Sequence, residues 1–154
     1  MKKVIVMVAL VMMGMFAYAT NDGAKVSQTG KVANSGEVIA MDKAMFINNV
    51  FDFQQKAAAW KYKGTKPAII DLYADWCGPC RQTAPIMKEL AKEYAGKIVI
   101  YKVNVDKEKE LAALFNATSI PLFVYIPLNG EPQLMRGAAD KATFKKAIDE
   151  FLLK

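Results

Sequence analysis

Short runs of apolar, often β-branched residues recur along the chain and predict five strands. Two of them, Ala68–Tyr73 and Ile98–Val105, are apolar along most of their length, as in strands that a parallel sheet buries on both faces. A later run precedes Asn129-Gly130, a pair that favours a hairpin turn, so the run after this turn should pair with it in antiparallel fashion. The predicted strands are Val38–Met41, Ala68–Tyr73, Ile98–Val105, Leu122–Ile126 and Gln133–Arg136.

Apolar residues at helical spacing predict four helices between and after these strands. Asp42 is a suitable N-cap for the first helix, whose apolar face consists of Met45, Phe46, Val50 and Phe53. Pro85 should kink the second helix, and Gly96 should end it. The other helices are expected over Cys77–Tyr94, Glu108–Asn116 and Lys141–Leu153, the last with Phe144, Ile148, Phe151 and Leu152 facing inward.

The order of these elements, β-α-β-α-β-α-β-β-α, predicts the fold class. Strands separated by helices should run parallel, and the closing hairpin adds an antiparallel pair. Helices must then cover both faces of one mixed central β-sheet, which makes the domain an α/β fold. The chain has 154 residues, enough for one domain with a hydrophobic core, which we expect over residues 37–154.

Residues 1–19 have the pattern of a secretory signal peptide. They begin with Met-Lys-Lys, continue as an uncharged apolar run from Val4 to Phe16, and end in Ala17-Tyr18-Ala19, so cleavage is expected after Ala19. An uncleaved membrane anchor is the alternative, but the apolar run is shorter than the roughly 18 residues that span a bilayer. A short Met-rich signal of this kind is typical of bacteria and predicts a periplasmic or secreted protein. Residues 20–36 are polar and are expected to form a flexible mature N-terminus.

The charge pattern argues against nucleic-acid binding. Net charge is +6 for the full chain, and the loss of Lys2 and Lys3 with the signal peptide would leave +4. The remaining basic residues alternate with acidic ones, as at Lys107-Glu108-Lys109-Glu110, which is typical of solvated helix faces rather than a basic stripe. We expect a monomer that binds no nucleic acid.

Both cysteines of the chain lie in the pentapeptide at residues 76–80, Trp-Cys-Gly-Pro-Cys, and the chain has no histidine. A structural zinc site would need two more sulfur or imidazole ligands, so no metal site is expected. A purely structural disulfide would stabilise little, because closing so short a loop removes little entropy from the unfolded chain. A redox-active dithiol, entered from a strand and followed by a helix, is the favoured interpretation.

The predicted position at a helix start explains how such a dithiol would react. Free N–H groups and the helix dipole there favour the thiolate of Cys77, which we expect to be exposed and to act as the nucleophile. Cys80, one turn further on, is expected to be buried and to resolve the mixed disulfide. Pro79 suits the first helical turn, where its missing N–H has no intrahelical partner.

The pentapeptide, preceded by Ile-Ile-Asp-Leu-Tyr-Ala-Asp, resembles the active-site segment of the thioredoxin family, and the resemblance continues over residues 37–154. It implies a thiol–disulfide oxidoreductase that uses no bound cofactor. It also implies that Asp71 is a buried proton acceptor for Cys80, acting through water, and that Lys102 modulates this carboxylate. Burial would raise the pKa of Asp71 toward neutrality, as proton transfer near pH 7 requires.

The resemblance also implies a substrate-binding surface around the dithiol. Ile120-Pro121 matches the peptide before a cis-proline, where the Ile120 backbone would bind an extended substrate segment. Gly137-Ala138 matches small residues that line the same groove. The expected surface comprises Trp76, Gly78, Pro79, Ile120, Pro121, Gly137 and Ala138.

Four of these residues have simpler interpretations. A strand aspartate is usually exposed, although the run around Asp71 is too apolar for that. Lys102 could merely extend its side chain to solvent. Trp76 could serve packing alone, and Pro121 could be a trans proline on an edge strand. Ser119 and Leu122 depart from the family's usual residues beside the cis-proline, and such departures could alter substrate preference.

The sequence therefore predicts an exported thioredoxin that reduces or exchanges disulfides in exported proteins. A reductant outside the cytosol needs electrons from across the membrane, so a membrane thiol-transferring protein is the implied donor. One alternative is the same dithiol acting as an oxidant, since direction follows from redox potential. The other is a peptide-binding or chaperone module that uses the groove around Trp76 and Ile120.

Overall fold

The computed structural model describes residues 36–55 and 59–154. The expected signal peptide, residues 1–19, lies outside the described residues, as does the 20–36 segment except Gly36. Within the described ranges, no helix combines the length and hydropathy that crossing a bilayer takes.

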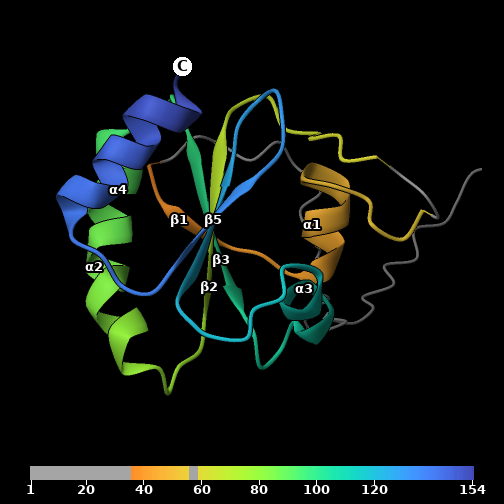
Figure 1. Cartoon of the computed structure of the whole chain (residues 1–154), viewed down its shortest axis with the longest axis horizontal. Coiled ribbons are helices and arrows are strands. Elements are labelled where there is room, and N and C mark those ends of the chain that lie inside the picture. The colour runs from red at the N-terminus through yellow and green to blue at the C-terminus, as the bar shows by residue number, and fades with distance from the viewer. Residues whose placement is uncertain (1–35, 56–58) are drawn as a thin grey trace, which may run out of the picture. The chain divides into compact units, whose positions relative to one another are not determined.

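A mixed five-stranded sheet with the order β1-β3-β2-β4-β5 forms the centre of the domain (Figure 1). Pairing of β1 with β3 and of β3 with β2 is parallel, whereas β4 pairs antiparallel with both β2 and β5. This topology confirms the predicted mixed sheet and closing hairpin. The strands are β1 (Val38–Ala40), β2 (Ala68–Tyr73), β3 (Val99–Asn104), β4 (Leu122–Ile126) and β5 (Gln133–Arg136).

Helices cover both faces of this sheet, as predicted. In Figure 1, α2 and α4 lie on one side of the strands and α1 and α3 on the other. The helices are α1 (Lys43–Asn49), α2 (Gly78–Glu93), α3 (Lys109–Leu114) and α4 (Lys141–Ala147), and a π-helical turn, η1 (Ile148–Leu152), follows α4. Pro85 lies inside α2, where the expected kink stays a prediction.

The first helix is shorter than its apolar spacing predicts. Asp42 caps it as expected, accepting a hydrogen bond from the Met45 backbone N–H at 2.7 Å. The helix ends at Asn49, because the Asp52 side chain accepts the Gln54 N–H and thereby stabilises a local turn instead of another helical turn. The prediction that Phe53 lies on the helix was therefore wrong, although its ring still packs edge-on against Phe46.

The C-terminal helix also differs from the single α-helix that was predicted. Its last turn widens, and the Leu153 N–H bonds to the Ile148 carbonyl five residues earlier. The three buried side chains here, Phe144, Ile148 and Leu152, are spaced by four residues. A turn wider than 3.6 residues keeps such a spacing on one face more easily than an α-helix does.

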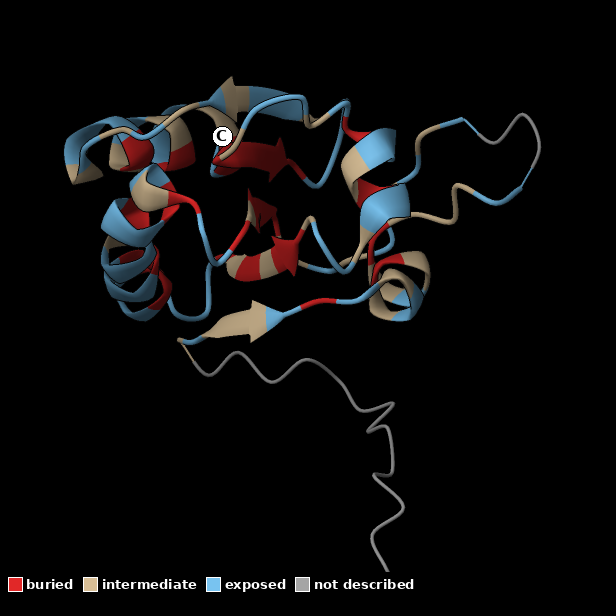
Figure 2. Ribbon diagram, turned by 90° about the horizontal axis from the view of Figure 1, so that it is seen from below, coloured by how far each residue is buried: buried red, intermediate tan, exposed pale blue. Residues whose placement is uncertain are grey.

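The core consists of two apolar layers, one on each face of the sheet, and Figure 2 shows the inner strands as mostly buried. Alternation along β2 sends Ile70 and Leu72 into the layer beneath α1 and α3, and Ile69 into the layer beneath α2 and α4. By the same alternation Asp71 shares the face of Ile69. The fold therefore places a carboxyl group inside the molecule on the side that α2 covers.

Candidate functional site

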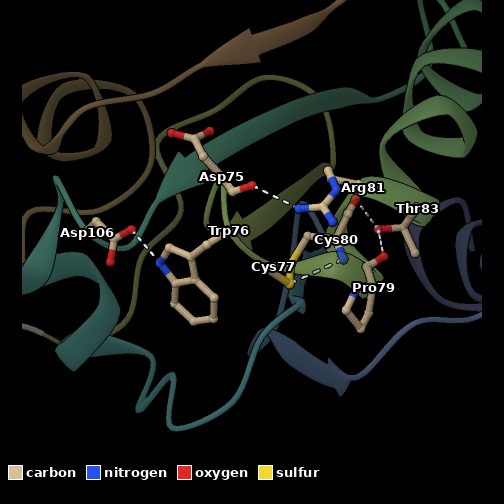
Figure 3. Close-up of a disulfide and its surroundings, with 8 residues drawn as sticks. All are labelled: Asp75, Trp76, Cys77, Pro79, Cys80, Arg81, Thr83 and Asp106. Carbon is tan, nitrogen blue, oxygen red and sulfur yellow. Dashed lines mark hydrogen bonds between the residues drawn. A yellow bond between two sulfur atoms is a disulfide. The ribbon is translucent and has the colours of Figure 1, made fainter.

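The two cysteines form a disulfide at the N-terminal end of α2 (Figure 3). Strand β2 ends at Tyr73, and a short turn leads to Cys77, which has extended backbone and caps the helix. The Cys77 sulfur accepts a hydrogen bond from the Cys80 N–H at 3.2 Å, and Pro79 occupies the first helical turn. The sulfur that was predicted to react is thus held against a free N–H of the helix terminus, the setting that favours a thiolate.

The expected difference in exposure between the two cysteines is absent. Cys77 is 4% exposed and Cys80 is 3% exposed, so the prediction of an exposed Cys77 was wrong for this disulfide-bonded form. The reason is packing: Cys77 and Cys80 form one buried cluster with Ala74, and Ile120 packs against this cluster.

Asp71 is buried, as predicted, with 5% of its surface exposed. Burial raises the pKa of this carboxyl to about 7, and the positive charge of Lys102 opposes the rise. One carboxyl oxygen, Oδ1, is fully buried and has no hydrogen-bond partner among the described residues. Asp71 is therefore a group that exchanges its proton near neutral pH.

A cavity of about 360 Å³ gives Asp71 room for water. Ala84 and Met87 of α2 line it, and Ala84 follows Cys80 by about one helical turn. Lys102 also lines the cavity, and it pairs with Asp71 across β2 and β3. The two residues that were predicted to act together thus share one cavity beside the cysteine-bearing helix.

Lys102 is half-buried, and its ammonium group lies 5.8 Å from the centre of the Tyr73 ring. Its side chain therefore faces a cation–π partner as well as the Asp71 cavity. The alternative that it merely extends into solvent does not describe this position.

The peptide bond between Ile120 and Pro121 is cis, which confirms that prediction and makes the trans alternative wrong. Pro121 is buried, and Ile120 packs against the two cysteines. The Gly137 N–H donates to the Pro121 carbonyl at 2.9 Å, which joins the two expected groove segments. Gly137 has a φ of +87°, which a side chain would strain, while Ala138 is exposed.

Trp76 is 68% exposed, so the alternative that it serves packing alone does not fit. Its indole N–H donates to the Asp106 carboxylate at 2.9 Å, as Figure 3 shows. Asp106 was not among the predicted site residues. The available signal was its place just after a buried strand, at the sheet edge where β2 also ends.

Within residues 36–55 and 59–154, no three His, Cys, Asp or Glu side chains gather closely enough to hold a metal ion.

The family model for thioredoxin matches residues 45–150 of the chain. The chain belongs to the thioredoxin family. A thioredoxin of Borreliella burgdorferi is 36% identical over 113 residues, which cover 73% of this chain and 96% of that protein. Chloroplastic M-type thioredoxins of Spinacia oleracea and Pisum sativum are 37% and 41% identical over 62% and 56% of the chain, respectively. These matches span 54% and 50% of the two plant proteins.

Family membership and the Cys77–Cys80 pair together define the activity in general terms. The chain is a thioredoxin-type thiol–disulfide oxidoreductase that acts on disulfide-containing substrates. The α/β fold with its mixed sheet agrees with this family.

The buried carboxyl predicts a pH dependence of stability. With the folded-state pKa near 7 and an ordinary value of 3.8, Asp71 releases its proton more readily when unfolded. The free energy of unfolding should therefore fall as pH rises from about 4 to 7. The disulfide-bonded Asp71→Asn variant has no carboxyl group here and should not lose stability in this way. Its free energy of unfolding, relative to that of wild type, should therefore increase by up to roughly 4 kcal/mol between pH 4 and pH 8.

Urea unfolding at both pH values measures this difference. Glu131→Gln, which changes an exposed carboxylate, controls for the loss of one negative charge. An Asp71→Asn advantage that is the same at pH 4 and pH 8 would contradict the raised pKa.

Proposed function

We propose that the chain is an exported thioredoxin that reduces or exchanges disulfides in exported proteins, with Cys77 as the nucleophile. The observation that carries the proposal is the Cys77 sulfur at the start of α2, where it accepts the Cys80 N–H. The same N–H and the helix dipole stabilise a thiolate on Cys77 once the disulfide is reduced. Export is supported by the N-terminal sequence, in which Lys2-Lys3 precede an apolar run that ends in Ala17-Tyr18-Ala19.

The reduction proceeds in two exchanges. The Cys77 thiolate attacks one sulfur of the substrate disulfide, a mixed disulfide forms, and the other substrate sulfur leaves as a thiolate. The Cys80 thiol then gives its proton to Asp71, through water in the adjoining cavity, and attacks the Cys77 sulfur. The second substrate thiolate leaves, the substrate has gained two electrons, and Cys77 and Cys80 are joined again.

Asp71 suits this step because burial raises its pKa to about 7. A carboxylate of that pKa accepts a proton from a thiol far better than one with an ordinary pKa near 4. Lys102, on the neighbouring strand, keeps a fraction of Asp71 ionised at neutral pH, because its charge lowers the pKa that burial raises.

The substrate would lie along the surface around the disulfide. Trp76 and Pro79 are exposed on one side, and Ala138 is exposed beside the cis-proline loop. Ile120 packs against the cysteines and would offer its backbone to an extended segment. The residues assigned to substrate binding are Trp76, Gly78, Pro79, Ile120, Pro121, Gly137 and Ala138.

Each turnover leaves the disulfide, so a dithiol donor must reduce it again. For a protein outside the cytosol, this donor would be a membrane protein that transfers thiol electrons. No bound cofactor takes part in the proposed exchange.

Serine substitutions test the roles of the two cysteines. Cys77→Ser should lower the rate of insulin reduction at least roughly 100-fold, because no other thiol is placed to attack. Cys80→Ser should still attack and should accumulate mixed disulfides on Cys77, which mass spectrometry detects and which identify the clients. Undiminished insulin reduction by Cys77→Ser would contradict the proposal, and insulin binding without reduction by wild type would favour a peptide-binding module.

The opposite direction of electron flow is the second candidate, because the redox potential of the Cys77–Cys80 pair sets that direction. Equilibration with dithiothreitol or glutathione buffers measures the redox potential. A reductant should give a value near the thioredoxin range, about −270 mV. A value near −120 mV, as in strong periplasmic oxidants, would replace the reductant with the oxidant.

A further inference from the structure

We propose that Asn104 is a positioning residue that fixes the exposed Trp76 for the docking of protein substrates. The inference rests on the proposed function, because it concerns the surface beside Cys77. Asn104 is the last residue of β3, and its partner across the sheet is Tyr73, the last residue of β2. It is 8% exposed, one of three buried polar or charged side chains among the described residues.

The Asn104 amide bonds to both segments that flank Trp76. Its Nδ2 group donates to the Asp75 carboxylate at 3.2 Å, and its Oδ1 atom accepts the Asp106 backbone N–H at 2.9 Å. Asp75 precedes Trp76 in the chain, and Asp106 accepts the indole N–H of Trp76. An amide suits this position, because its NH2 group donates to a carboxylate while its oxygen accepts from an N–H.

The backbone around Asn104 holds the same loop. Its carbonyl accepts the N–H groups of Lys107 and Glu108, which folds the turn that carries Asp106. On the other side, the Arg81 guanidinium donates to the Asp75 carbonyl at 3.2 Å, as Figure 3 shows. Asp75 and Asp106 are thus each held at two points, and Trp76 lies between them.

This arrangement matters because Trp76 is too exposed to be held by packing. A side chain that is 68% exposed would otherwise sample several rotamers. Fixing the indole before a substrate arrives lowers the ordering cost of binding a broad protein surface. A small disulfide that touches only the sulfurs gains nothing from it. Asn104 should therefore govern affinity for protein disulfides and leave the chemistry at Cys77 unchanged.

A donor–acceptor exchange tests the assignment. Asn104→Asp keeps the acceptor for Asp106 but removes the donor and places two carboxylates against each other. We expect it to raise the KM for insulin about fivefold, the effect of losing a hydrogen bond of ordinary strength. Its rate with 5,5′-dithiobis(2-nitrobenzoate), a small disulfide reagent, should equal that of wild type. The double variant Asn104→Asp/Asp75→Asn restores a donor opposite an acceptor and should restore the KM.

Hydrogen exchange of the Trp76 indole N–H, followed by NMR, reports the positioning directly. The chain has two tryptophans, and the Trp60→Phe spectrum assigns the signals. Exchange should quicken in Asn104→Asp, as in Asp106→Ala, and should slow again in the double variant. Asn129→Asp is the control, because it adds the same charge in the hairpin loop after β4. This loop follows the end of β4 that pairs with the start of β2, whereas Trp76 follows the end of β2. The control should change neither the insulin KM nor the indole exchange rate.

An unchanged insulin KM in Asn104→Asp would overturn the proposal, as would a double variant no better than the single one. An equal loss with insulin and with the small disulfide would also overturn it, because that pattern indicates general damage to the fold. The proposed function is tested separately. Its failure would appear as undiminished insulin reduction by the Cys77→Ser variant, in which Asn104 is unchanged.

Discussion

The burial of the Asp71 carboxyl group is the constraint on which the proposed chemistry of this chain depends. It lies in β2, the middle strand of the sheet, with β3 and β4 on either side and α2 above. Burial there disfavours the charged form and brings the pKa to about 7. The same strand leads to Cys77, and the helix that covers Asp71 begins at the disulfide, so this carboxyl group lies close to the two thiols in the fold.

The two cysteines lie in different surroundings, which suit the different roles proposed for their thiols. Cys77 caps the helix and faces a backbone N–H, which favours a thiolate at the point of attack. Cys80 lies within the first turn and is as buried as its partner, so in the proposed mechanism its proton needs a nearby acceptor before it can react. In the proposed mechanism, water in the cavity that Asp71 and α2 line carries this proton. In the disulfide form the two cysteines are equally buried. They differ in their electrostatic surroundings, because the Cys77 sulfur accepts the N–H at the start of the helix.

Much of this structure could be predicted, because it follows from the order of apolar and polar residues within short segments of the sequence. The apolar runs identified every strand, and the motif at residues 76–80 placed the dithiol at a strand–helix junction. The apolar run around Asp71 and the family resemblance predicted its burial. The resemblance to a family supplied the cis bond before Pro121, which residue pattern alone did not determine.

The rest depends on contacts between segments distant in sequence. The end of α1 is set by a side-chain turn at Asp52 that competes with a favourable helical spacing. The low exposure of Cys77 follows from packing against Ile120, over forty residues away. Likewise, Asn104 was not among the predicted site residues, and only the meeting of β2 and β3 brings it between Asp75 and Asp106.

The central claim is that Asp71 accepts the proton of Cys80, and single-turnover kinetics test it most directly. Rapid acid quenching of the reduced protein with a disulfide substrate resolves formation of the mixed disulfide from its decay. In Asp71→Asn the decay should slow while formation keeps its wild-type rate, because only the second step passes a proton to this carboxylate. Equal slowing of both steps, or of neither, would contradict the account.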